Sequence, residues 1–319
     1  MAIDAADAAG ASNTPPLIYR GHSDYIFSLA FSPGGATLAS ASRDTTVRVW
    51  RINPFNTETE DITVYRKHKG SLLSVAWSPD GKYIASGDTS GIVQVWDALT
   101  GNTLTTYRGH ARFVRGIAWS PDGKHIVSGG DYGDSTAQVW ETFTGNLLFR
   151  HTRQYRIFAV AWEPRGSHIA TCSFDGSVML WDAFTGEIKQ THTGHNGPVY
   201  TTAWSPDGAY IASGGQDDTI QVWEAATGKI MCVYRGHTRT IKCLAWSPDS
   251  QHIISSGDDM SVQIWKVATG ERVFSDDSHQ KWIRAVAWSP DGNAIAATSD
   301  YTVQVVTNVL MNYDNRKRE

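Results

Sequence analysis

The stretch YRGHARFVRGIAWSPDGKHIVSGG, from Tyr107 to Gly130, carries the pattern that decides the fold of this chain. It contains Gly-His, an alternating run that ends in an aromatic residue, the turn sequence Ser-Pro-Asp-Gly, and a second alternating run. Alternation with a period of two residues predicts strands. Proline fixes a turn φ and glycine tolerates a positive φ, so Ser-Pro-Asp-Gly predicts a hairpin between the two strands.

This pattern recurs along the whole chain. In six copies a histidine stands nine residues before an aromatic residue, and Trp162 marks a seventh copy in which Arg153 replaces the histidine. The histidines are His22, His68, His110, His195, His237 and His279. Successive copies are spaced by 46, 42, 43, 42, 42 and 42 residues. A period of this length fits a blade of four short strands.

With Trp-Asp at 96–97 and 181–182, these motifs resemble the WD40 repeat family over roughly residues 17–307. The resemblance implies an all-β, seven-bladed WD40-type β-propeller with four-stranded antiparallel blades. The near-identical copies also resemble those of bacterial WD40 proteins. We expect residues 1–16 to form a flexible N-terminal segment, 17–307 a single propeller and 308–319 a C-terminal tail.

The seventh copy lacks an outer strand of its own, because only a short tail follows its three-strand set. Residues Leu17 to Arg20 align with the outer-strand ends Tyr107-Arg108 and Tyr234-Arg235 of other copies. We therefore predict that the N-terminal strand completes the last blade. Such a closure joins the ring and protects sheet edges that would otherwise be open.

Four copies carry His, Ser, Asp and Trp at matched positions. The family resemblance implies a buried hydrogen-bonded network, which satisfies polar groups that burial would otherwise leave without partners. A hydrolase reading is the alternative, but a nucleophile needs an exposed and unique site rather than several equivalent copies. We therefore expect a structural network and no catalytic residues. Its members are His22, Ser40, Asp44, Trp50, His110, Ser128, Asp134, Trp140, His195, Ser213, Asp217, Trp223, His237, Ser255, Asp259 and Trp265.

Three copies depart from this set. Copy two has Ser90 where aspartate is expected, copy four has Arg153, and copy seven has Ala297 and Val306 in place of Ser and Trp. Because an incomplete network is less rigid, we expect blades four and seven to be the looser ones.

Positions that stay the same in all copies are explained by the fold, so the solvent-facing positions that vary between copies are the candidates for function. In WD40 proteins, the residues three and five after the loop histidine and the one before the turn aspartate point to the top face. Here these positions are rich in aromatic and arginine residues, which are enriched at interface hot spots. The predicted partner-binding residues are Tyr25, Phe27, Arg43, Phe113, Arg115, Tyr132, Arg156, Phe158, Phe174, Tyr200, Lys242, Trp282 and Arg284. The alternative is that they plug the channel or pack between blades.

Other top-face positions are less distinctive. They are Ser71, Leu73, Pro198, Gln216, Thr240, Asp258 and Ser299. The insertion Asp131 to Asp134 and the longer loop Asn53 to Glu60 are secondary candidates, and each can equally be tolerated loop length.

Top-face cations outnumber acidic groups, although the whole chain has a net charge of −4. This predicts a non-catalytic scaffold or sensor module that binds a protein or an acidic peptide. Binding of single-stranded nucleic acid through stacking on the same face is one alternative, and a channel-site hydrolase is another. No metal-ligand spacing is present, so we expect no metal and no cofactor.

The cysteines, the N-terminal sequence and the hydropathy of the chain bear on localisation. Cys172, Cys232 and Cys243 form neither a disulfide framework nor a metal motif. The N-terminus lacks the features of an export signal, and no window approaches 18 uninterrupted apolar residues. We expect a cytoplasmic, monomeric propeller without a membrane partner.

Overall fold

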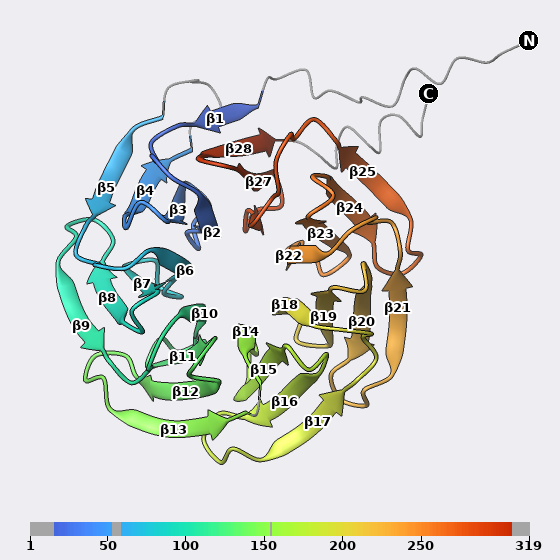
Figure 1. Ribbon diagram of the computed structural model, residues 1–319. Coiled ribbons are helices and arrows are strands. Elements are labelled where there is room, and N and C mark those ends of the chain that lie inside the picture. The colour runs from blue at the N-terminus through green and yellow to red at the C-terminus, as the bar shows by residue number, and fades with distance from the viewer. Residues whose placement is uncertain (1–15, 53–58, 154, 308–319) are drawn as a thin grey trace, which may run out of the picture.

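The computed structural model describes residues 16–52, 59–153 and 155–307, in which every regular element is a strand. The strands form seven antiparallel sheets of four, arranged as blades around a central axis (Figure 1). The predicted all-β, seven-bladed propeller is therefore confirmed. The predicted tail 308–319, residues 1–15 of the predicted N-terminal segment and residues 53–58 of the long loop in copy one lie outside the described residues.

Blades are numbered by sequence copy, and each runs from its inner to its outer strand. Blades 1 and 2 contain β2 (Ile26–Phe31), β3 (Thr37–Ser42), β4 (Val47–Arg51), β5 (Asp61–Tyr65), β6 (Leu72–Trp77), β7 (Tyr83–Asp88), β8 (Val93–Asp97) and β9 (Thr103–Tyr107). Blades 3 and 4 contain β10 (Val114–Trp119), β11 (His125–Gly130), β12 (Thr136–Glu141), β13 (Leu147–Thr152), β14 (Ile157–Trp162), β15 (His168–Ser173), β16 (Val178–Asp182) and β17 (Ile188–His192).

Blades 5 and 6 contain β18 (Val199–Trp204), β19 (Tyr210–Gly215), β20 (Ile220–Glu224), β21 (Ile230–Tyr234), β22 (Ile241–Trp246), β23 (His252–Gly257), β24 (Val262–Lys266) and β25 (Arg272–Asp276). Blade 7 contains β26 (Val286–Trp288), β27 (Ala294–Ser299), β28 (Thr302–Thr307) and β1 (Leu17–Tyr19).

Small residues on the inner strands let the blades approach one another near the axis. The clearest case is Gly116 on β10, where an added Cβ would lie only 2.8 Å from the backbone nitrogen of Val160 in blade 4. Any larger side chain at this position would force the two blades apart. The run of small residues at this position in all seven copies thus sets how closely the inner strands pack.

In blades 1 to 6 a tryptophan near the end of the third strand couples neighbouring blades. Trp96 and Trp140 are fully buried and stack on Tyr65 and Tyr107, the last residues of the preceding outer strands, at centroid distances of 4.3 and 4.4 Å. These aromatic pairs contribute beyond their buried area. The inter-blade contacts therefore explain why the chain uses so many tryptophans.

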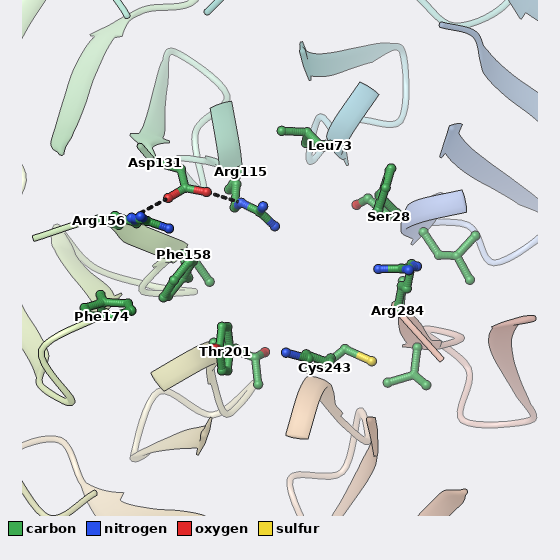
Figure 2. A pocket seen from close by; sticks show the side chains of 17 residues that line it. Ser28, Leu73, Arg115, Asp131, Arg156, Phe158, Phe174, Thr201, Cys243 and Arg284 are labelled. Atoms are coloured by element: carbon green, nitrogen blue, oxygen red, sulfur yellow. Dashed lines mark hydrogen bonds and ion pairs between the residues drawn. The ribbon is translucent and has the colours of Figure 1, made fainter. Parts of the chain in front are cut away.

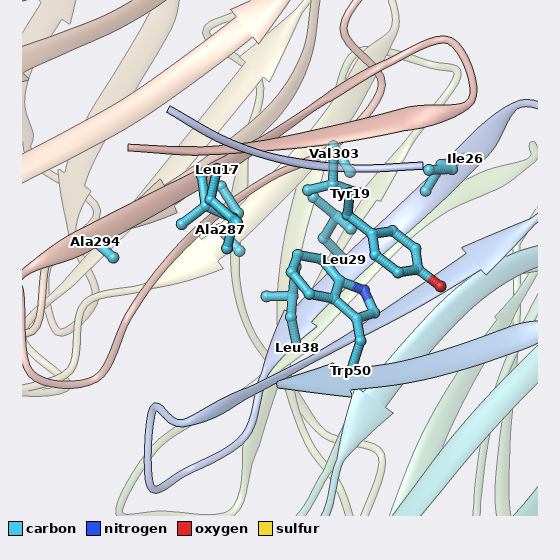
Figure 3. Packing of buried hydrophobic residues seen from close by; sticks show 12 residues of the cluster. Leu17, Tyr19, Ile26, Leu29, Leu38, Trp50, Ala287, Ala294 and Val303 are labelled. Atoms are coloured by element: carbon cyan, nitrogen blue, oxygen red, sulfur yellow. The ribbon is translucent and has the colours of Figure 1, made fainter. Parts of the chain in front are cut away.

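The N-terminal strand closes the ring as predicted. β1 pairs antiparallel with β28, with Leu17 opposite Val305 and Tyr19 opposite Val303 (Figure 1). The Tyr19 ring stacks on Trp50 of blade 1 at 4.3 Å, within a cluster that joins the two blades (Figure 3). The Tyr19 hydroxyl donates a hydrogen bond to Asp61 of blade 1. The seam therefore ties blade 7 to blade 1 with both apolar and polar contacts.

Blade 7 has the shortest inner strand, with only three residues in β26. In the segment before β26, the backbone amides of Arg284 and Ala285 donate to the side chain of Thr298 on β27. The distances to Thr298 Oγ1 are 3.0 and 3.1 Å. The irregular segment immediately precedes the shortened strand. This geometry supports the expectation that blade 7 is looser, which stays a prediction.

Candidate functional site

The loop histidine of each regular copy is buried and links two parts of its blade. In blade 1, His22 Nε2 lies 2.7 Å from Ser40 Oγ, and Nδ1 lies 2.8 Å from Asp44 Oδ2. Blades 3, 5 and 6 repeat these contacts, with His–Ser distances between 2.7 and 2.9 Å and His–Asp distances between 2.7 and 3.1 Å. The sets fasten the loop before each inner strand to the turn between the second and third strands.

The aspartates of these sets are charged at neutral pH. Burial alone would raise the pKa of Asp134, but hydrogen bonds from His110 and Thr136 outweigh it and lower that pKa to about 2. In the same way, burial opposes ionisation of Asp44, and hydrogen bonds from His22 and Thr46 hold its pKa well below the usual range. A buried carboxylate that is fully hydrogen-bonded in this way rigidifies its surroundings.

Two of the departing copies use substitutes. In blade 2, Asp88 takes the role that the alignment assigned to position 90, and its Oδ2 atom lies 2.8 Å from His68 Nδ1. In blade 4 the Arg153 guanidinium forms an ion pair with Asp175 at 2.9 Å, and its side chain is 7% exposed. Blade 4 thus has a buried arginine paired with a partly exposed aspartate where other blades have an imidazole. The predicted looseness of this blade stays a prediction.

The tryptophan link of the predicted network is present in only some blades. Trp96 and Trp140 donate from Nε1 to the serine hydroxyl of their blades, at 3.1 and 3.0 Å. In blades 1, 5 and 6 the Nε1 atoms of Trp50, Trp223 and Trp265 are buried without a hydrogen-bond partner in the described residues. The prediction that these three belong to the hydrogen-bonded network is therefore wrong. Stacking on the preceding outer strand holds their indole rings instead.

The serine hydroxyls of the sets are not placed for nucleophilic chemistry. Ser40, Ser128, Ser213 and Ser255 are fully buried, each inside the middle strand pair of its blade. A serine nucleophile must reach a substrate carbonyl, and in this structure none of these four can. The geometry therefore supports a structural role for the sets.

The varying top-face residues surround a cavity at the channel mouth. Its volume is about 500 Å³, and every blade contributes to its wall (Figure 2). Eight of the thirteen predicted partner-binding residues line it, namely Phe27, Arg115, Arg156, Phe158, Phe174, Tyr200, Lys242 and Arg284. We call this space the mouth cavity. Its volume lies in the range of ligand pockets in proteins.

The other predicted residues lie around it. Tyr25 and Trp282 line a second cavity of about 220 Å³ together with Arg284, Met260, Lys281 and Asp300, which we call the side cavity. Tyr132 is 55% exposed and lies under the Arg156 guanidinium. Arg43 and Phe113 line neither cavity, and Arg43 instead lies 3.6 Å from Asp24.

Asp131, predicted only as the first residue of the insertion in copy three, lines the mouth cavity. Its amide donates to Phe113 O at 2.9 Å, as the amide of Arg43 does to Tyr25 O in blade 1. Asp131, not Tyr132, therefore occupies the aligned top-face position of blade 3. The constant offset of 21 residues from the loop histidine, which joins His22 to Arg43 and His110 to Asp131, could have identified it.

Asp131 is buried between two arginines of neighbouring blades. It forms an ion pair with Arg115 Nε, and its second oxygen lies 3.9 Å from Arg156 Nε (Figure 2). On another side of the cavity, Lys242 Nζ lies 3.5 Å from Asp258 and 3.8 Å above the Tyr200 ring. These contacts hold three of the four cations of the cavity in fixed places.

Arg284 differs from the other three cations. Its guanidinium lies 5.1 Å from the rings of Tyr25 and Phe27 and 5.8 Å from that of Trp282. Within the described residues, no carboxylate lies within ion-pair distance of it. Cation–π contacts therefore orient this guanidinium without neutralising its charge.

The possible metal ligands, membrane-spanning helices and cysteines of the described ranges bear on other kinds of chemistry. No group of three or more His, Cys, Asp or Glu residues there is placed to hold a metal ion. No helix in that part of the chain has the length and apolar character of a membrane span. The three cysteines are free, and burial raises the pKa of the Cys172 and Cys243 thiols to about 12.

The ring of repeated blades, the buried histidine sets and the open mouth together define a β-propeller of the WD-repeat class. A family model described as "WD domain, G-beta repeat" matches residues 13–51, 59–97 and 101–141. A second, "IFT122 first beta-propeller", matches residues 156–314. The chain belongs to the WD40-repeat β-propeller family.

Several curated proteins are similar to parts of the chain. Human F-box-like/WD repeat-containing protein TBL1X is 26% identical over 184 residues, which are 57% of this chain and 26% of that protein. Protein Notchless of Drosophila melanogaster is 44% identical over 181 residues, or 55% of this chain and 36% of that protein. Human Angio-associated migratory cell protein is 34% identical over 68 residues, 21% of this chain and 16% of its own length.

The chain thus spans about a third or less of the length of these relatives. All three are animal proteins, and the predicted likeness to bacterial repeat proteins stays a prediction.

Proposed function

We propose that this propeller is a non-catalytic scaffold that binds a protein or an acidic peptide over the mouth cavity. The observation that carries the proposal is the convergence of the variable positions of all seven copies on one cavity. Positions that the repeat fixes serve the fold, whereas these positions differ from blade to blade and meet at one place.

The chemistry of the cavity favours a polypeptide with acidic groups. Phe158 contacts Tyr200 and Phe174 at centroid distances of 4.7 and 6.3 Å, which forms a continuous aromatic wall. Beside this wall lie four cations, whereas the whole chain has a net charge of −4. Rigid aromatic rings and forked guanidinium groups are typical of protein interfaces, and a local positive field steers acidic partners toward them.

A pull-down with intact protein and a Trp282→Ala/Arg156→Ala variant tests the proposal. The intact protein should recover partners that the variant loses, because an exposed aromatic anchor and a cavity cation are both removed. A matched control is Phe184→Ala/Arg165→Ala, which removes an exposed aromatic and an exposed arginine at the opposite ends of the blades. If the top-face variant and the control recover the same partners as intact protein, this face is not the binding surface.

The proposal also includes the cellular compartment and the oligomeric state of the propeller. Free, buried thiols suit a reducing compartment. We therefore place the propeller in the cytoplasm as a monomer, and fractionation with size-exclusion chromatography tests both points.

A further inference from the structure

The charge of the mouth cavity narrows the chemistry of the partner. Arg115, Arg156, Lys242 and Arg284 line it, while the carboxylates in contact with these cations are Asp131 and Asp258. Two of the four positive charges therefore remain uncompensated. Because an excess of positive charge around one cavity attracts a complementary anion, it favours a ligand group that carries close to two negative charges.

The geometry of the arginines selects among such groups. Figure 2 shows Arg115 and Arg284 reaching from blades 3 and 7 toward the same space. Arg115 is fixed by Asp131, and Arg284 is fixed by three aromatic rings. Guanidinium groups bind the oxygens of phosphate through paired N–H donors, and pre-ordering them lowers the entropy cost of binding.

The candidate binding site is larger than the mouth cavity alone. Arg284 lines both the mouth cavity and the side cavity, and Trp282 and Tyr25 form an aromatic wall of the second. A free anion would use only the first cavity, whereas a peptide carrying a phosphate could place a neighbouring side chain in the second. The continuity of the two cavities through one residue therefore favours a chain ligand.

Resting on the proposed function, we infer that the mouth cavity takes a phosphorylated serine or threonine of the bound peptide. A phosphate monoester carries a charge of about −1.5 to −2 at neutral pH, which matches the uncompensated charge. Arg284 is the central recognition residue, because its charge has no internal counter-ion in the described part of the chain.

The experiment measures binding of the full chain to fluorescein-labelled pentapeptide pools by fluorescence anisotropy. The central residue is fixed as phosphoserine, serine or glutamate, and the flanking residues are degenerate. We expect the phosphoserine pool to bind at least about tenfold more tightly than the serine pool, with glutamate weaker than phosphoserine. Equal binding of the phosphoserine pool and either other pool, or binding of no pool, overturns the inference.

A second arm distinguishes a peptide from a free anion. Inorganic phosphate is added as a competitor, and we expect half-displacement only at concentrations well above the dissociation constant of the phosphoserine pool. Competition by phosphate at that same concentration would show that the cavity takes a free anion, which overturns the peptide assignment.

Variants locate the binding. Arg284→Gln should remove the preference for phosphoserine, and Arg284→Lys should restore part of it, since it keeps the charge but not the fork. Arg165→Gln removes an exposed arginine in the turn at the other end of β14 and should leave the preference unchanged. Equal losses in Arg284→Gln and Arg165→Gln would indicate a general charge effect and overturn the inference.

Failure here is distinguishable from failure of the proposed function. If the Trp282→Ala/Arg156→Ala variant loses partners while the pools do not discriminate phosphate, the binding face stands and the phosphate assignment falls.

Discussion

At the scale of single residues, the same repeat position does different work in different blades. Ser86 contacts both His68 and the Trp96 indole, at 2.8 and 3.1 Å. Ser213 contacts His195 at 2.9 Å, but the Trp223 indole of its blade has no such partner in the described residues. Blades 2 and 5 can therefore be compared directly, because they differ in whether the tryptophan indole donates a hydrogen bond to the serine.

From this comparison we predict unequal effects of one substitution. Ser86→Ala removes the partner of His68 Nε2 and of the buried Trp96 indole, whereas Ser213→Ala removes only the partner of His195 Nε2. Ser86→Ala should therefore destabilise the protein by roughly 1 kcal/mol more than Ser213→Ala. Thermal unfolding of both variants measures the difference, and equal melting temperatures would contradict it.

The charged aspartates predict how stability depends on acid. The folded-state pKa of Asp134 is about 2, below the ordinary value of 3.8. A lowered carboxylate pKa stabilises the fold fully above the ordinary value, and this contribution is lost as the pH falls from about 4 toward 2. The melting temperature of the Asp134→Asn variant should start lower at neutral pH and fall less across this window. A parallel decline of variant and wild type would rule out this role for Asp134.

At the scale of elements, the seam depends on β1, a strand of three residues at the outer edge of blade 7. Leu17 and Tyr19 of β1 are buried, whereas Ile18 between them is 38% exposed. This alternation places the two apolar side chains against Val303 and Val305 of blade 7 and against Trp50 of blade 1 (Figure 3). A strand of three residues therefore couples the first and last blades.

Removing residues 1–20 should open the edge of β28 and weaken the ring. Each buried apolar side chain contributes roughly 1.5–3 kcal/mol, so we expect the melting temperature to fall on the order of 5–10 °C. The matched control removes residues 1–15 and keeps β1, and its melting temperature should equal that of the full chain. If the longer deletion also melts like the full chain, the seam does not stabilise the propeller.

At the scale of the whole molecule, the propeller separates a positive mouth from a chain that is acidic overall. Each blade alone offers one to three top-face side chains, and only closure of the ring brings them to one cavity. Carboxylates hold three of the four mouth cations, and aromatic rings hold the fourth. We infer that this pre-ordered surface suits a compact anionic group more than an extended polyanion.

This distinction predicts the response to salt. A single strand of nucleic acid bound through four phosphate contacts would lose about fiftyfold in affinity between 50 and 200 mM salt. Binding of the phosphoserine pool, which places one anion between fixed arginines, should lose less than about tenfold over the same range. Anisotropy titrations at the two salt concentrations measure this. A single-stranded oligonucleotide that binds more tightly than the pool, with the steeper salt dependence, would favour the nucleic-acid alternative.

Much of the site could be predicted because the repeat marks its own variable positions. Eight of the predicted residues line the mouth cavity, since a fixed offset from the loop histidine places a side chain at a fixed height in every blade. At the insertion in blade 3 the prediction named Tyr132, whereas Asp131 occupies the aligned position. In blade 2 the pattern predicted an aspartate at position 90, but the carboxylate that reaches His68 belongs to Asp88, two residues earlier.

The sequence by itself determined the number of blades, their strands and the closure at Leu17 to Arg20, because strand periodicity, turn residues and repeat length are local properties. Only the tertiary structure decided which charges compensate one another. Arg115 and Arg156 share Asp131 across two blades, while the Arg284 guanidinium lies against three aromatic rings and has no ion-pair partner among the described residues. Those pairings depend on distances between blades, which no single repeat encodes, and they determine what the mouth of the propeller can bind.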